Sequence, residues 1–159
     1  MKLFSKEKKT NTLSLLAVAD GEVLDLSTIP DEAFSSGMLG DGFAIKPRGD
    51  TVFAPAEGVI GTVSENGHAY SIASDIGDLL VHIGVDTLSL GEAFEPLVNP
   101  SQSVFAGQPI ARVDFDKIRA AGLCDSVILL ITEKRISGEI NIQKGSARGG
   151  KDIALRVEK

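Results

Sequence analysis

Two histidines, His68 and His82, are the only imidazoles in the chain, and their spacing allows them to act together. His68 lies in SENGHAYSIAS and His82 in DLLVHIGVDT, and the intervening SDIG has the residues of a tight turn. A hairpin that turns near Asp75 places positions 68 and 82 opposite each other. Side chains opposite one another across a hairpin share a face, about 5 Å apart at Cβ. The sequence therefore predicts an imidazole pair.

An imidazole pair is compatible with several chemistries. Imidazole titrates near neutrality, which suits general acid–base catalysis. A metal site needs a further ligand such as a carboxylate, because two histidines are too few. In a third alternative, one ring nitrogen accepts a phosphoryl group while the second imidazole donates to the phosphate oxygens. The two histidines can also be unrelated, one exposed in a loop and one in the core, and spacing alone does not decide among these alternatives.

The elements that position the histidines are short apolar runs separated by frequent turns. Runs such as GFAIKP, TVFAP, VIGTV and SVILLIT are rich in strand-forming residues, and turn signals such as LGDG, PRGD and ENGH lie between them. The chain also holds 17 glycines and 6 prolines. This pattern is typical of an all-β sandwich or barrel.

Two stretches are expected to add one or two helical turns each. PDEAFSSGM, residues 30–38, offers a proline and two acids for a first turn. FDKIRAAGL, residues 115–123, has Asp114 or Asp116 as its cap and Gly122 as its stop.

Composition limits the domain organisation and the function classes. The net charge of −6 and the lack of a basic stripe with interleaved aromatics argue against nucleic-acid binding. MKLFSKEKKT holds four lysines, so we expect residues 1–16 to form a flexible tail with at most peripheral membrane contact and residues 17–159 to form one domain. No apolar run approaches the roughly 20 residues of a membrane span, and Cys124, the only cysteine, is expected to fill core space. These features favour a cytoplasmic protein.

Four segments carry a resemblance to a known family. They closely resemble the glucose-type IIA (EIIA) proteins of the bacterial phosphoenolpyruvate:sugar phosphotransferase system, over nearly the whole chain from about residue 17. The resemblance implies an antiparallel β-sandwich and a phosphotransferase with no metal or other cofactor. It also implies two protein partners: the carrier HPr, which supplies the phosphoryl group, and the IIB domain of a sugar transporter, which receives it. The segments are MLGDGFAIKP (38–47), VFAPAEGVIGTV (52–63), HAYSIASDIGDLLVHIGVDT (68–87) and GQPIARVDFDKI (107–118).

The resemblance also implies roles for individual residues. His82 is the phosphoryl acceptor, and His68 stabilises the phosphate as it is transferred. The carbonyl of Gly84 accepts the second ring N–H of the acceptor, and Gly84 has no side chain to block approach. A docking surface is expected around the histidines, with an apolar patch rimmed by carboxylates that meet an arginine of HPr. Its members are Phe34, Leu80, Ile83, Asp31 and Asp86, although Leu80 and Ile83 are equally compatible with the core and Asp31 with a helix cap.

Three positions near His68 depart from the family pattern. Many relatives have a threonine whose hydroxyl orients this ring, where the chain has Asn66, so the amide of Asn66 is expected to orient the ring instead. Gly67 replaces a residue with a side chain, and Ser64 stands where some relatives have a phenylalanine of the docking patch. These departures bear on rate and partner choice and leave the acceptor in place.

Two other functions compete with the phosphocarrier. A zinc peptidase of the lysostaphin type shares the run seen in VFAPAEGVIGTV, but it needs a third histidine in a His-x-His pair, which the chain lacks. A regulatory protein that kept the fold and transfers phosphate weakly is the second alternative.

Overall fold

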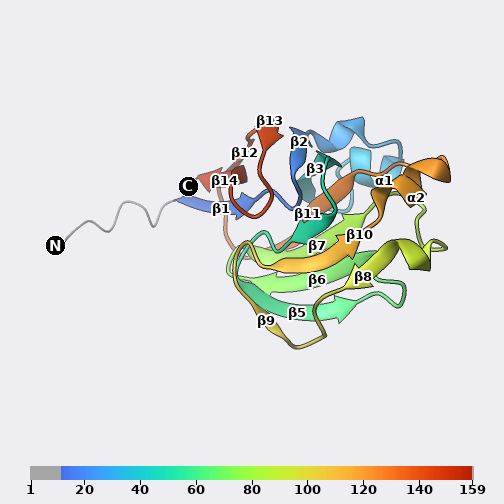
Figure 1. Ribbon diagram of the computed structural model, residues 1–159. Helices are drawn as coiled ribbons and strands as arrows, with labels where there is room; N and C mark the ends of the chain where they lie inside the picture. The colour runs from blue at the N-terminus through green and yellow to red at the C-terminus, as the bar shows by residue number, and fades with distance from the viewer. Residues whose placement is uncertain (1–11, 159) are drawn as a thin grey trace.

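The computed structural model of the chain describes residues 12–158, which form short antiparallel strands and a few helical turns (Figure 1). The helical segments are η2 (Leu26–Thr28), α1 (Glu32–Ser35), η3 (Gly91–Ala93) and α2 (Phe115–Ala120). The strands are β1 (Thr12–Leu16), β2 (Gly21–Leu24), β3 (Asp41–Pro47), β4 (Thr51–Phe53), β5 (Gly58–Val63), β6 (Ala69–Ser74), β7 (Gly77–Ile83), β8 (Phe94–Pro96), β9 (Ser103–Val104), β10 (Pro109–Val113), β11 (Val127–Lys134), β12 (Glu139–Ile142), β13 (Gly145–Ala147) and β14 (Ile153–Glu158).

Within these residues the strands form three sheets, and every paired neighbour is antiparallel. The longest sheet has the order β13-β2-β3-β11-β7-β6-β5-β9, and the others are β4-β10-β8 and β1-β14-β12. In Figure 1, β8 and β10 lie across the face of β5, β6 and β7. Ile110 of β10 and Ile72 of β6 are buried in the same apolar cluster. The predicted all-β antiparallel sandwich is confirmed.

Strand β7 carries one of the histidines and alternates strictly between two faces. Leu79, Val81 and Ile83 are 0–1% exposed and lie in the main core between the sheets. Leu80 and His82 are half-buried and point to the opposite face, because successive side chains of a strand alternate. The strand is therefore anchored on one side and presents the imidazole on the other.

A second, smaller apolar cluster covers the face to which His82 points. Pairing of β7 with β11 and of β11 with β3 places His82, Ile128 and Ala44 in one row across the sheet. Leu26 of η2 and Phe34 of α1 pack in one cluster with Ile128 and Ala44. Cys124 is half-buried and packs against this cluster, outside the main core. The buried members of the cluster are Leu26, Ile29, Phe34, Ala44, Val85, Ile128 and Leu130.

Both predicted helical stretches are confirmed, and each begins at an aspartate cap. The Asp31 carboxylate accepts the N–H of Ala33 at 2.9 Å at the start of α1, which satisfies a backbone donor without an intrahelical partner. Asp114 caps α2, and Gly122 follows that helix with a φ of +77°. Asp116, the other candidate cap, instead contacts Arg119 at 2.9 Å.

The amino-terminal segment differs from the prediction in part. Residues 1–11 of the expected tail lie outside the described residues. Residues 12–16 form β1, which pairs with β14, so the prediction that the tail extends to residue 16 is wrong. The alternation in TLSLL explains the difference, because Leu15 is fully buried in the main core. In residues 12–158 no helix combines the length and the apolar character needed to cross a membrane.

Candidate functional site

The hairpin of β6 and β7 brings the two imidazoles together, although its register differs from the predicted one. Ala69, not His68, stands opposite His82, so the predicted pairing is wrong by one residue. His68 lies just before β6, where its carbonyl accepts the N–H of Ile83 at 2.7 Å. Since His68 lies in a bend outside the regular pleat, its ring can turn towards His82. The ring centroids lie 5.2 Å apart with an interplanar angle of 84°.

The orientation of the His82 ring is set by the backbone of the following turn. Its Nδ1 lies 2.8 Å from the carbonyl oxygen of Gly84. A carbonyl oxygen accepts hydrogen bonds and cannot donate, so Nδ1 carries the proton and donates it. Nε2 then keeps its lone pair. This tautomer leaves one nucleophilic nitrogen on the ring.

Gly84 is needed for a tightly packed turn. Its φ is +76°, and an added Cβ would lie 2.5 Å from Cγ2 of Thr87 and 2.9 Å from the carbonyl oxygen of Cys124. Thr87 is 1% exposed, and its hydroxyl donates to the carbonyl of Ile83 at 2.6 Å. A side chain at position 84 would therefore displace the carbonyl that holds His82. Packing of this turn, more than open access for a partner, accounts for the glycine.

The His68 ring contacts Ser64 instead of Asn66. The Ser64 hydroxyl lies 3.1 Å from Nδ1 of His68. The amide of Asn66 donates to the carbonyl of Leu88, so it connects two loops. The prediction that Asn66 orients the ring is therefore wrong. Ser64 was expected only as a departure from the family pattern, and its contact with His68 was not predicted. The contact depends on a turn, in which the N–H of Gly67 donates to the carbonyl of Ser64, that brings the hydroxyl back to the ring.

A small cavity of about 200 Å³ lies beside the two rings. The Phe34 ring is tilted by 54° against the His82 ring, with ring centroids 5.2 Å apart. Asp31 and Asp86 line the same cavity, so both predicted carboxylates lie beside the His82 ring. Asp31 is also the cap of α1, and both interpretations of this residue therefore apply.

Two of the residues predicted for the docking surface, Leu80 and Ile83, lie on opposite faces of β7. Ile83 is 0% exposed in the main core, so the prediction that its side chain belongs to a docking surface is wrong. Leu80 is half-buried on the same face as His82. Leu88, which sequence reasoning missed, is 60% exposed and lines the cavity beside the rings. A large apolar residue immediately after the VDT turn was the available signal for it.

Burial keeps both rings in the neutral form near neutral pH. Desolvation lowers the pKa of His82 below its usual 6.5, and the carbonyl of Gly84 and the charges of Asp31 and Asp86 partly oppose this shift. Burial also lowers the pKa of His68, and the neighbouring His82 lowers it further. A neutral His82 keeps the Nε2 lone pair that a nucleophile needs. Residues 12–158 contain no group of three His, Cys, Asp or Glu side chains placed to hold a metal ion.

We expect both histidines to titrate below pH 6.5 in the folded chain. Proton NMR of the ring C2 signals tests this, because a chain without a histidine tag has only two such signals. His82→Gln should raise the titration midpoint of His68 while leaving it below 6.5. The substitution removes the charge of the neighbouring imidazole, but the burial of the His68 ring remains. The urea-unfolded chain is the control and should titrate near 6.5.

The same shifts fix the sign of the pH dependence of stability. The folded state binds fewer protons than the unfolded state between the lowered pKa values and 6.5. The contribution of the two rings to the free energy of unfolding is therefore constant above pH 6.5 and falls as the pH drops below it. A midpoint above 6.5 for either ring would contradict the assigned environment.

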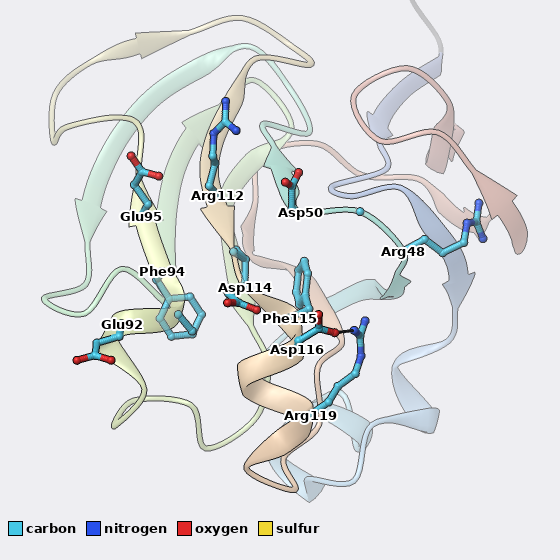
Figure 2. A pocket seen from close by; sticks show the side chains of 13 residues that line it. Arg48, Asp50, Glu92, Phe94, Glu95, Arg112, Asp114, Phe115, Asp116 and Arg119 are labelled. Atoms are coloured by element: carbon cyan, nitrogen blue, oxygen red, sulfur yellow. Dashed lines mark hydrogen bonds and ion pairs between the residues drawn. The ribbon is translucent and has the colours of Figure 1, made fainter.

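A larger hollow of about 490 Å³ lies elsewhere and is lined by neither histidine. Figure 2 shows its charged side chains on η3, β8, β10, α2 with its cap, and the loop after β3, with Asp116 and Arg119 joined by an ion pair. Arg119 also contacts the buried carboxylate of Asp125 at 2.6 Å. The other charged residues of the lining carry both signs: Arg48, Arg112, Asp50, Glu92, Glu95 and Asp114. This mixture indicates a solvated surface more than a site for one ligand.

Fold and site together define a small β-sandwich protein with a paired-imidazole site. The sequence pattern of the family described as phosphoenolpyruvate-dependent sugar phosphotransferase system, EIIA 1, matches residues 13–136. The glucose-specific EIIA component of Haemophilus influenzae is 35% identical over 163 residues, which cover 99% of this chain and 97% of that protein. The chain therefore belongs to the EIIA 1 family of the phosphotransferase system.

Other relatives differ in length or have known structures. The glucose-specific EIICBA component of Streptococcus pneumoniae is 34% identical over 152 residues, which cover 94% of this chain but 21% of that protein. The chain thus spans about a fifth of the length of this longer relative. The solved structure of glucose permease IIA from Mycoplasma capricolum matches with a TM-score of 0.82 and 33% identity, over 98% of this chain and 99% of that one.

Proposed function

We propose that the chain is a cytoplasmic phosphocarrier that accepts a phosphoryl group on Nε2 of His82 and passes it to a sugar transporter. The observation that carries the proposal is the hydrogen bond from Nδ1 of His82 to the Gly84 carbonyl, which leaves Nε2 as the nucleophilic nitrogen. Family membership supports the reaction class. The His82 ring is half-buried and burial lowers its pKa, so the Nε2 lone pair is available to attack phosphorus near neutral pH.

The proposed transfer balances without a metal or an external base. The Nε2 lone pair of His82 forms a bond to phosphorus while the bond from phosphorus to the donor's ring nitrogen breaks, and that electron pair returns to the donor. The product ring carries a positive charge, since Nδ1 keeps its proton. The hydrogen bond to Gly84 then becomes charge-assisted and stronger. Alignment and charge stabilisation are the main requirements of this reaction, because its transition state is loose.

The surroundings of His82 favour transfer over storage of the phosphoryl group. His68 is close enough to donate a hydrogen bond to the phosphoryl oxygens, because the rings lie 5.2 Å apart. Asp31 and Asp86 repel a bound phosphoryl group and attract a cationic partner. Phe34, Leu80 and Leu88 supply an apolar surface beside these charges.

Two partners follow from the proposed reaction. The donor is the phosphohistidine of HPr, and the family resemblance implies an arginine on HPr that meets the two carboxylates. The acceptor is the cysteine of a transporter IIB domain. Relatives named EIICBA in Streptococcus pneumoniae and EIIBCA in Corynebacterium glutamicum support this second partner, because their names join the A unit to B and C units.

Labelling of the wild-type chain tests the proposal. The protein is incubated with enzyme I, HPr and phosphoenolpyruvate labelled in its phosphoryl group, and a control omits HPr. We expect one phosphoryl group per chain, stable in alkali and lost in acid, with the label on the peptide that contains His82. A folded chain that takes up no label would favour the regulatory alternative. Stoichiometric tight zinc binding with peptide cleavage would favour the lysostaphin-type peptidase.

A further inference from the structure

The Ser64 hydroxyl makes three contacts at the loop between β5 and β6. Its oxygen accepts the backbone N–H groups of His68 and Ala69, each at 3.0 Å. The same oxygen lies 3.1 Å from Nδ1 of His68. The backbone N–H of Ser64 also donates to the carbonyl of Ala69 at 2.9 Å, which closes the loop. One serine therefore holds both the loop and the ring.

The number of contacts determines which atom donates to which. A hydroxyl has one proton and two lone pairs, and a backbone N–H can only donate. Both lone pairs of the Ser64 oxygen are used by the two N–H groups. The remaining contact must be made with the hydroxyl proton, so Nδ1 of His68 is the acceptor. In the neutral ring, the proton then lies on Nε2.

We propose that Ser64 is a positioning residue that fixes His68 in the Nε2–H tautomer, opposite to the tautomer that Gly84 fixes in His82. His68 is thereby a donor at its free nitrogen while His82 is a nucleophile at its own. A serine four residues before the histidine takes the place that the amide of Asn66 does not fill, because Asn66 bonds the carbonyl of Leu88.

The arrangement also disfavours a protonated His68. A charged ring would carry a proton on Nδ1, facing an oxygen whose lone pairs are already occupied by two backbone donors. One of those donors would have to be released before Ser64 could accept from the ring. The consequence for phosphoryl transfer rests on the proposed function, whereas the tautomer is a property of the unphosphorylated chain.

Nitrogen-15 NMR of the imidazole rings tests the tautomer directly, because protonated and unprotonated ring nitrogens have separate shifts. In the wild-type chain above pH 7.5 we expect the unprotonated nitrogen to be Nδ1 in His68 and Nε2 in His82. Ser64→Ala should shift the tautomer ratio of His68 by about tenfold, the effect of one net hydrogen bond, and leave His82 unchanged. Ser64→Thr, which keeps a hydroxyl at this position, should retain the wild-type tautomer ratio.

Ser71→Ala is the matched control. The Ser71 hydroxyl lies on the same hairpin and accepts the N–H of Thr62 at 2.8 Å, whereas the side-chain hydrogen bonds of the two rings go to Ser64 and Gly84. In the transfer assay we expect Ser64→Ala to slow delivery to the IIB domain about tenfold and Ser71→Ala to leave it unchanged.

A wild-type His68 protonated at Nδ1, or an unchanged ratio in folded Ser64→Ala, would overturn the assigned role of Ser64. If Ser64→Ala does not fold, the wild-type spectrum and Ser64→Thr still decide the matter. Failure of the wild-type chain to accept phosphate would overturn the proposed function alone, since the tautomer is measured without phosphate.

Discussion

Replacing His82 by alanine will reduce phosphoryl uptake from phospho-HPr to less than about one thousandth of the wild-type rate. The reason is the loss of the ring nitrogen that forms the bond to phosphorus in the proposed reaction. His68 does not substitute for it, because its Nδ1 faces the Ser64 hydroxyl. Single-turnover labelling with phosphorylated HPr measures the effect.

His82→Gln is the companion variant, because glutamine fills most of the volume of the ring without offering a nucleophilic nitrogen. Thermal unfolding followed by circular dichroism shows whether both variants remain folded. Label that persists in folded His82→Ala at a rate near the wild-type rate would overturn the assignment of the acceptor.

Replacing His68 by alanine will separate the two halves of the reaction. We expect uptake from HPr to continue, because Gly84 holds the His82 ring independently of His68. Delivery to the IIB domain should slow by about 10²–10³-fold, the usual effect of losing one donor to a transition state. Uptake and delivery are measured separately, each with purified partners in a single turnover.

Asn66→Ala is the control for this prediction, because Asn66 lies in the same loop but contacts the Leu88 carbonyl and neither ring. We expect both of its half-reactions to proceed at rates near those of the wild-type chain. Normal delivery by His68→Ala would remove the donor role of His68, and a large loss in folded Asn66→Ala would restore the orienting role first expected for that amide.

The sequence was sufficient to predict the sandwich, both helical turns and the pair of imidazoles. Turn residues and apolar alternation are local signals, and they indicate strands whatever the partner strand is. Register is not local in this sense. The two segments were expected to pair at 68 and 82, whereas Ala69 is opposite His82, because the position of a turn determines which residues pair.

The wrong expectation for Asn66 and the missed contact of Ser64 arise from the path of a loop, which no residue pattern specifies. Ser64 and Asn66 are both polar residues near His68, and only the path of the loop decides which of them reaches the ring. Ile83 is apolar, as a docking residue can be, but it directly follows His82 on a strand and therefore faces the opposite side of the sheet. Alternation along the segment VHI was enough to predict this last point.

The two faces of β7 have a consequence for how specificity can change. On one face the strand packs in the main core, and on the other Leu80 packs against the smaller cluster beside His82. Exchange of Leu80 would therefore alter the surface proposed to meet protein partners while leaving the main core intact. The proposed recognition surface and the core thus use opposite faces of the same seven-residue strand.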